Sequence, residues 1–211
     1  VVVFALFSGL IVALLGAAGY LFLTADLRGT VAAQLSALGD LCETSLEKWV
    51  DEQARTVGSL ARLPAVQKMA SSLLPDPTGE GAWAPARSEM ADFFSVIAEG
   101  HAEFREICLL APTGGLVVLS TTRASEGQYR VTDSAFVMGR TGLHVQSVHP
   151  SPVSLLPTLT ISAPVFNAAG VPAGVLAVDL NLDSMDRLVK VGTGLGPGEE
   201  SYLVDRFHVF V

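Results

Sequence analysis

The carboxyl group of Asp179 stands in an otherwise apolar strand pattern, Gly174-Val-Leu-Ala-Val-Asp-Leu180. Side chains alternate between the two faces of a strand, so Asp179 shares its face with Val175 and Ala177. An unpaired carboxylate among such neighbours is strongly disfavoured, because burial removes its hydration. Its partner is either the cation or amine of a ligand, or an internal arginine or loop amides. The strand therefore predicts either a binding site or an internal pairing of this carboxylate.

Four other residues could line the same site. The hydroxyls of the expected strand 158–165 alternate with apolar residues, and they either line a polar pocket or face water. The expected strand 143–148 carries a histidine that contacts a ligand or is an ordinary surface residue. Phe136 could close a pocket as an aromatic wall or anchor a core. The candidate ligand-binding residues are thus Asp179, Phe136, His144, Ser147 and Ser162.

No catalytic motif accompanies these residues. The 4 histidines form no H-E-x-x-H sequence, and G-x-S-x-G and the glycine-rich phosphate-binding motifs are missing. No Cys or His pair has metal-ligand spacing, so we expect no metal and no cofactor. Cys42 and Cys108 are interpreted as buried free thiols, with a disulfide as the alternative. The pattern favours binding over catalysis, although a nucleophile and base from distant positions stay a third possibility.

Five short strands are expected to position the candidate residues. Ala-Pro-Thr-Gly-Gly is a hairpin turn signal between the first two strands, and a polar stretch over 121–133 follows the second. Asp183 is expected to cap a short helix that runs through Val189. Closely spaced, hairpin-linked strands after helices predict a mainly antiparallel α+β module. The expected strands cover residues 106–110, 116–120, 143–148, 158–165 and 174–180.

A long helix is expected over residues 25–63, because apolar residues recur there at steps of three and four. Pro64 ends or kinks it, and a short helix resumes through residue 74. A loop over 75–85 and a helix over 86–99 follow. The apolar stripe of the long helix could face the module's own sheet or a partner helix, and we expect a homodimer through this helix.

The first twenty-four residues contain no charged side chain. A helix of that length is roughly 36 Å long, enough to cross a hydrocarbon core of about 30 Å. A cleavable signal peptide is the alternative, but its apolar core usually has about 7–15 residues. The flank that follows has little basic charge, so the rest of the chain is expected outside the cytoplasm at the inner (plasma) membrane. The net charge of −8 argues against nucleic acid as a partner.

The whole arrangement resembles the double Cache (dCache) sensor domain of bacterial transmembrane receptors. The matching segments are SLEKWVDEQARTVGSLARLPAVQ, EICLLAPTGGLVVLST, TLTISAPVFNAAGVPAGVLAVDLNLDSMDRLV and GPGEESYLVDR. The resemblance implies a PAS-like membrane-distal module that binds a small molecule and signals through the membrane to a cytoplasmic output. The expected domains are a transmembrane helix (1–24), a signalling helix (25–74), the membrane-distal module (75–191) and the start of a truncated membrane-proximal module (192–211).

The resemblance also bears on individual residues. In amino-acid-binding members of this family, an Arg-x-Trp-Tyr-like segment holds the ligand carboxylate, and an Asp in the last strand of the distal module holds the amine. Asp179 matches that Asp position. The other segment falls near 129–136, where this chain has no Trp-Tyr pair. Phe136 stands approximately at the aromatic position, whereas Arg130 lies too far upstream to be carried over.

The expected function is therefore extracytoplasmic small-molecule sensing, with no enzymatic activity in this chain. The receptor would be of the chemoreceptor, sensor kinase, phosphatase or cyclase type. The alternative is a non-catalytic structural or protein-interaction module anchored in the membrane, which a closed interior and an internally paired Asp179 would favour.

Overall fold

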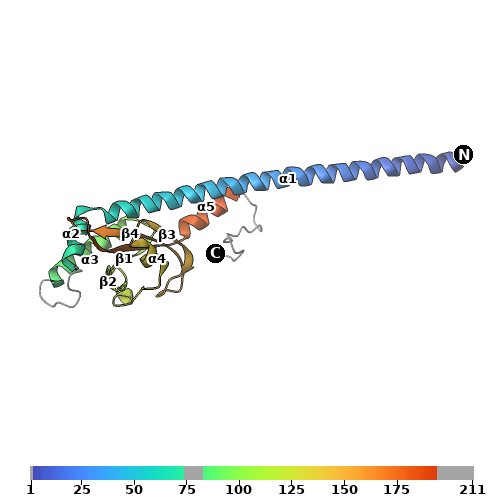
Figure 1. Cartoon of the computed structure of the whole chain (residues 1–211). Coiled ribbons are helices and arrows are strands. Elements are labelled where there is room, and N and C mark those ends of the chain that lie inside the picture. The colour runs from blue at the N-terminus through green and yellow to red at the C-terminus, as the bar shows by residue number, and fades with distance from the viewer. Residues whose placement is uncertain (1, 74–82, 194–211) are drawn as a thin grey trace.

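The computed structural model describes residues 2–73 and 83–193 (Figure 1). Helix α1 (Val2–Ala61) leads into α2 (Pro64–Leu73), and α3 (Trp83–Gly100) precedes the sheet. A 3-10 turn (Arg123–Ser125) and helix α4 (Ser134–Gly139) lie between the second and third strands, and α5 (Asp183–Thr193) follows the last. The strands are β1 (Phe104–Leu110), β2 (Val117–Ser120), β3 (His144–Pro150), β4 (Pro157–Phe166) and β5 (Pro172–Leu180).

The strands form one five-stranded sheet in the order β2-β1-β5-β4-β3. Every neighbouring pair in it is antiparallel, which confirms the predicted α+β class. The hairpin between β1 and β2 turns at Gly114 and Gly115, whose φ angles of 73° and 63° lie in the left-handed region that glycine adopts without strain. The last strand in sequence, β5, lies at the centre of the sheet and carries Asp179.

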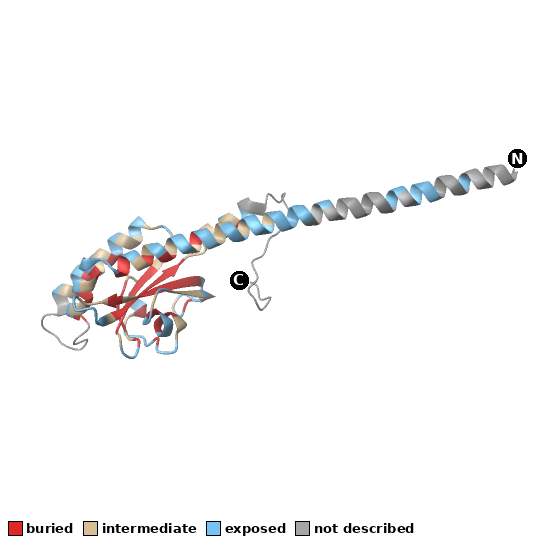
Figure 2. Ribbon diagram, turned by 45° about the horizontal axis from the view of Figure 1, so that its top comes forward, coloured by how far each residue is buried: buried red, intermediate tan, exposed pale blue. Residues whose placement is uncertain are grey.

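The larger core lies between one face of the sheet and helices α1, α2 and α3 (Figure 2). Alternate residues of the central strands point to it, among them Ile107, Leu109, Leu176 and Val178, all fully buried. On α1, Trp49, Val57 and Leu60 face this core. The C-terminal part of the apolar stripe therefore packs on the module's own sheet, whereas Leu35 and Leu41, nearer the N-terminus, are exposed.

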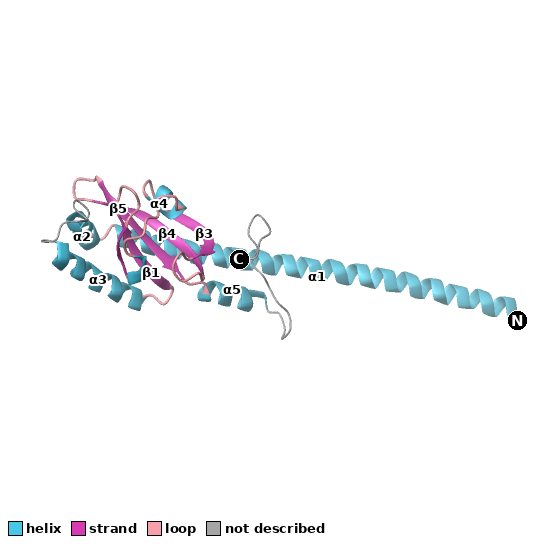
Figure 3. Cartoon of the chain, turned by 90° about the horizontal axis from the view of Figure 1, so that it is seen from below, coloured by secondary structure: helices cyan, strands magenta, loops and turns pink. Residues whose placement is uncertain are grey.

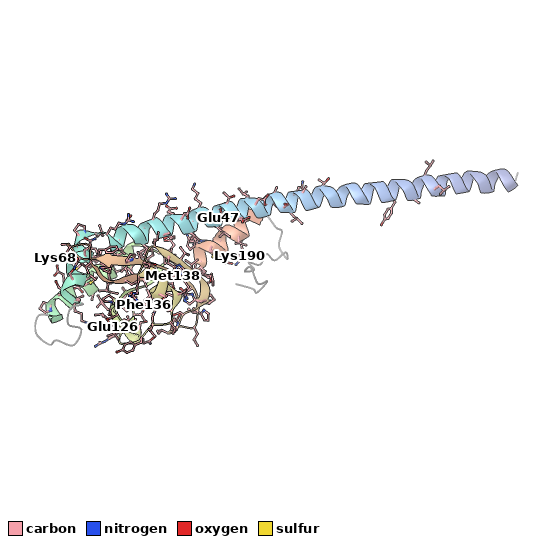
Figure 4. All side chains as sticks on the ribbon, viewed as in Figure 1. Glu47, Lys68, Glu126, Phe136, Met138 and Lys190 are labelled. Carbon is pink, nitrogen blue, oxygen red and sulfur yellow. The ribbon has the colours of Figure 1, made fainter. Side chains whose placement is uncertain are left out.

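The opposite face of the sheet carries α4 and the segment that connects it to β2. Figure 3 shows α4 over β3 and β4, with α1 on the far side of the sheet. A second, smaller apolar cluster lies here, and Figure 4 shows its Phe136 on α4, across the sheet from α1. The cluster consists of Cys108, Leu110, Val117, Phe136, Val175 and Ala177.

Helix α4 is absent from the sequence-based prediction. It has only 6 residues, too few to show a 3.6-residue apolar period. Its N-cap is Asp133, whose carboxylate accepts a hydrogen bond from the Ala135 N–H at 3.1 Å. Asp133 ends the predicted polar stretch over 121–133, and as a capping residue it is the local sequence signal for this helix.

Helix α1 extends well beyond the module toward the N-terminus (Figure 1). Among the described residues, no helix contains a stretch that is both long and apolar enough to cross a bilayer. The transmembrane helix over 1–24 stays a prediction. Most of the predicted loop over 75–85 lies outside the described residues, as does the predicted second module after Thr193.

The two-layer packing makes α3 a test of the larger core. Phe94 is fully buried on α3, whereas Val96 on the same helix is 66% exposed. We expect Phe94→Ala to lower the free energy of unfolding by about 3–5 kcal/mol, because it leaves a cavity under the sheet. Val96→Ala is the matched control, with an expected change within about 0.5 kcal/mol. Urea unfolding followed by circular dichroism measures both, and equal effects would contradict this packing.

Candidate functional site

Strand pairing aligns side chains from four strands, most of them polar, in two adjacent rows on the α4 face of the sheet. Neighbouring rows arise because residues two apart on a strand share a face. The first row contains Glu106, Asp179, Thr160 and Gln146, which are successive partners across β1, β5, β4 and β3. The second row contains Cys108, Ala177, Ser162 and His144 on the same strands.

Arg130 faces Asp179 across the first row. Its Nη2 lies 3.8 Å from Asp179 Oδ2, and the side chains are 5% and 2% exposed. This distance is too long for a hydrogen bond. Thr160 Oγ1 donates a hydrogen bond to the other carboxylate oxygen, Oδ1, at 2.6 Å. Among the described residues, Asp179 Oδ2 and the Nε and Nη2 atoms of Arg130 are buried without a hydrogen-bond partner.

The structure thus brings Arg130 next to Asp179, although the family resemblance does not carry Arg130 over as a site residue. The β1–β2 hairpin explains its position: the Arg130 N–H donates to the carbonyl oxygen of Gly115 at 2.9 Å. A Cβ atom at Gly115 would lie 3.1 Å from the Arg130 carbonyl carbon and 3.0 Å from the Phe136 ring, so the backbones approach closely here. Sequence spacing does not reveal such a long-range contact.

Glu106 is a second acid in the first row, and sequence analysis missed it. It is 4% exposed and lies directly opposite Asp179 in the β1–β5 register. Ser120 Oγ donates a hydrogen bond to Glu106 Oε1 at 2.5 Å, and Cys108 Sγ donates to the same oxygen at 3.2 Å. The signal for it was the same as for Asp179: an acid within an otherwise apolar strand.

Burial governs the protonation of the site. Burial raises the pKa of Asp179, and the nearby Glu106 carboxyl adds to this, whereas the Arg130 guanidinium and the Thr160 hydroxyl oppose it. Burial also raises the pKa of the Cys108 thiol well above its usual range, so this side chain is a neutral donor. Burial by itself would lower the pKa of Arg130, but its neighbours Cys108, Asp179 and Glu106 raise it, and the guanidinium stays charged.

The residues predicted for the site do not all lie together in the structure. Ser162 and His144 are cross-strand partners, and the buried Ser162 Oγ and His144 Nε2 atoms have no hydrogen-bond partner within the described part of the chain. Phe136 packs on Val175 and Ala177 beside them. Ser147 is exposed on β3, away from the group that the structure brings together, and we leave it out of the candidate site.

His149 comes close to this group because of an irregularity in β3. Simple alternation places His149 on the face opposite to His144, but the β3–β4 register shifts between Gln146 and His149. Its Nε2 consequently lies 3.5 Å from Thr160 Oγ1. A bulge of this kind has no reliable sequence signal in this segment.

An open groove of about 520 Å³ lies beside the polar rows. It passes Val137 and Arg140 at the end of α4, and the Arg140 guanidinium carbon lies 5.5 Å from the centre of the Phe136 ring. Arg130 and Asp179 do not line it, and both side chains are almost completely buried. Within the described ranges, no cluster of His, Cys, Asp and Glu could hold a metal ion.

Gly139 tests how closely α4 must approach the sheet. A Cβ atom there would lie 2.5 Å from Ser162 Oγ and 3.0 Å from Val175 Cγ1. We expect Gly139→Ala to lower the free energy of unfolding by about 1–3 kcal/mol through overpacking. Adding Ser162→Gly should recover part of this loss. Gly142→Ala is the control, because a Cβ atom there meets nothing within 4 Å. If it lowers the free energy of unfolding as much as Gly139→Ala does, the close approach of α4 to the sheet is contradicted.

The raised pKa of Asp179 predicts a pH dependence of stability. The folded state binds this proton more tightly than the unfolded state, so the free energy of unfolding falls as pH rises from about 4 through the folded pKa. Because Arg130 opposes the shift, Arg130→Met should raise the folded pKa of Asp179 further and extend the fall to higher pH. Urea unfolding between pH 4 and 8 measures this effect.

Two further variants control that measurement. Arg123→Met removes an exposed arginine and should leave the pH profile unchanged. Arg130→Met combined with Asp179→Asn removes the titrating group and should abolish the added pH dependence. A pH dependence that persists in the double variant would assign it to another group.

Comparison with known proteins supports the fold. No family model and no curated protein sequence matches the chain. Among solved structures, the sensor domain of the V. cholerae histidine kinase DctB matches with a TM-score of 0.54 at 15% identity, over 78% of this chain and 59% of that chain. The ligand-binding domain of the Campylobacter jejuni chemoreceptor Tlp3 with 4-methylisoleucine gives 0.57 at 16%, over 84% and 68%.

The same Tlp3 domain with isoleucine bound gives a TM-score of 0.52 at 17% identity, over 83% of this chain and 69% of that chain. The chain thus spans 59% of the length of the DctB sensor domain and somewhat more of the Tlp3 domain. At these identities the comparison concerns the fold, and it confirms the fold that the sequence resemblance implies. The chain has the fold of sensory ligand-binding domains.

Proposed function

We propose that this chain is an extracytoplasmic domain of a bacterial membrane receptor that senses a small molecule bound between Arg130 and Asp179. One observation carries the proposal: a buried guanidinium and a buried carboxylate face each other at 3.8 Å without forming a hydrogen bond. Buried polar atoms are nearly always hydrogen-bonded, so unpartnered atoms on both ions indicate a place for a further molecule. The chemistry is binding, with no turnover.

The unpartnered atoms also indicate what the ligand carries. Nε and Nη2 lie on one edge of the Arg130 guanidinium, and two N–H groups on one edge match the two oxygens of a carboxylate. Asp179 Oδ2 is an acceptor suited to an ammonium group. A ligand with a carboxylate close to an amine satisfies both. The Tlp3 domain of similar fold is described with isoleucine bound, which is compatible with this chemistry.

Binding must open the site, because both ions are almost completely buried. A ligand shifts a conformational equilibrium only by binding one state more tightly than the other. The open state would separate Arg130 from Asp179 and lift the segment that contains Arg130 and Phe136. The sheet that carries Asp179 packs on α1, which leads to the charge-free segment 1–24. We place that segment in the membrane and the exposed Leu35 and Leu41 in a homodimer interface.

A second candidate is a structural or protein-interaction module without a ligand. The closed position of α4 and the proximity of Arg130 to Asp179 favour it, because an internal ion pair would need no further partner. In that case the pair stabilises the fold, and variants at either residue change stability but no binding equilibrium.

Ligand screening distinguishes the two. We expect the melting temperature of the full chain to rise with at least one compound in a panel of amino acids and organic acids. A compound at one hundred times its Kd stabilises the folded state by about 2.7 kcal/mol. Asp179→Asn should abolish this effect, whereas Asp92→Asn, at an exposed position on α3, should retain it. Unchanged affinity in Asp179→Asn would refute the assigned site, and a panel without any hit would favour the structural module.

A further inference from the structure

The site around Arg130 contains more acid than base. Glu106 and Asp179 are directly opposite each other on β1 and β5, and both are almost completely buried. Within the part of the chain that the structure describes, Arg130 is the one guanidinium whose charge interacts with both of these carboxyl groups. Asp133 faces Arg130 from the start of α4, and its carboxylate already caps that helix. His149 approaches from β3 and is the other basic group that acts on Asp179.

Glu106 has spare capacity to accept a hydrogen bond. Its Oε1 atom receives the hydrogen bonds of Ser120 and Cys108. Its Oε2 atom accepts none of the hydrogen bonds between described residues and, unlike Asp179 Oδ2, keeps some exposure to solvent. With 4% of its surface exposed, Glu106 nevertheless differs from a surface glutamate, whose carboxylate is fully solvated by water. The two carboxyl groups together therefore offer two free oxygens, Glu106 Oε2 and Asp179 Oδ2, to a bound cation.

We propose that Glu106 selects a ligand with a net positive charge, namely an amino acid that carries a second basic group. The inference rests on the proposed function, because it narrows the ligand of the same site. A neutral amino acid brings one carboxylate for Arg130 and one ammonium for Asp179, and it leaves Glu106 uncompensated. Because a buried charge without a partner is costly, a second cationic group on the ligand completes the charge balance.

The same charge balance argues against two other classes of ligand. A dicarboxylate would add negative charge beside two carboxyl groups. A diamine without a carboxylate would leave the Nε and Nη2 edge of Arg130 without a partner. The diamino or guanidino monocarboxylates are the class that supplies a partner to all three side chains.

Isothermal titration calorimetry on the full chain tests the inference with two matched pairs of probes. L-lysine and L-ornithine carry a terminal ammonium, whereas L-norleucine and L-norvaline have the same carbon chains without it. We expect the basic member of each pair to bind at least about tenfold more tightly, as for hydrogen bonds to charged groups. Tighter or equal binding of the neutral members would overturn the inference and leave the proposed function intact.

The variant Glu106→Gln assigns the preference to this side chain. Glutamine keeps an oxygen that can accept from Ser120 and Cys108 but removes the charge. We expect it to abolish the preference for L-lysine over L-norleucine, while Glu99→Gln, exposed on α3, retains it. A preference that persists in Glu106→Gln would overturn the assignment. If that variant does not fold, the comparison of probes on the unaltered chain still decides the ligand class.

The absence of binding by all four probes would also overturn the inference. The melting-temperature screen of amino acids and organic acids then tests the proposed function separately. Stabilisation by an organic acid or a neutral amino acid would support small-molecule sensing without the preference for basic ligands. Melting temperatures of each variant without probe serve as the control for folding.

Discussion

Arg130 and Asp179 are buried together and lie too far apart for a hydrogen bond. This incomplete pairing is the constraint on which the rest of the site depends. Removing an ion from water costs several kcal/mol, and only close pairing with full hydrogen bonding offsets that cost. Here the two ions lie 3.8 Å apart, and Asp179 Oδ2 has no hydrogen-bond partner among the described residues. The site therefore contributes little to stability by itself. The apolar packing on the other face of the sheet must hold the strands in place.

The two faces of the sheet are connected by a short series of polar contacts. Arg87 on α3 forms an ion pair with Glu126 in the segment after β2. The other oxygen of Glu126 accepts a hydrogen bond from the Ser120 N–H at 3.2 Å, and the Ser120 hydroxyl holds Glu106. The position of Glu106 in the site thus depends on a helix that packs on the opposite face. Such support holds the Glu106 side chain in a defined position.

The parts of this structure that follow from local periodicity were predictable, and the parts that follow from long-range contacts were not. The five strands and Asp179 were readable because alternation reports which residues share a face. Arg130 was left out because its position depends on Gly115 in a distant hairpin, and α4 was too short to show a period. Glu106 was within reach of the same reasoning as Asp179, since both are acids in apolar strands.

Strand β5 connects the candidate site directly to the helices on the other face of the sheet. Asp179 points to the α4 face of the sheet, whereas its neighbours Val178 and Leu180 point to the core that contains α1. Because core packing is dense and resists compression, a displacement of the strand at Asp179 must be accommodated on both faces. Helix α5 begins just after β5 and contacts α1. A change at one carboxylate can therefore reach the long helix through a single strand, with no further element in between.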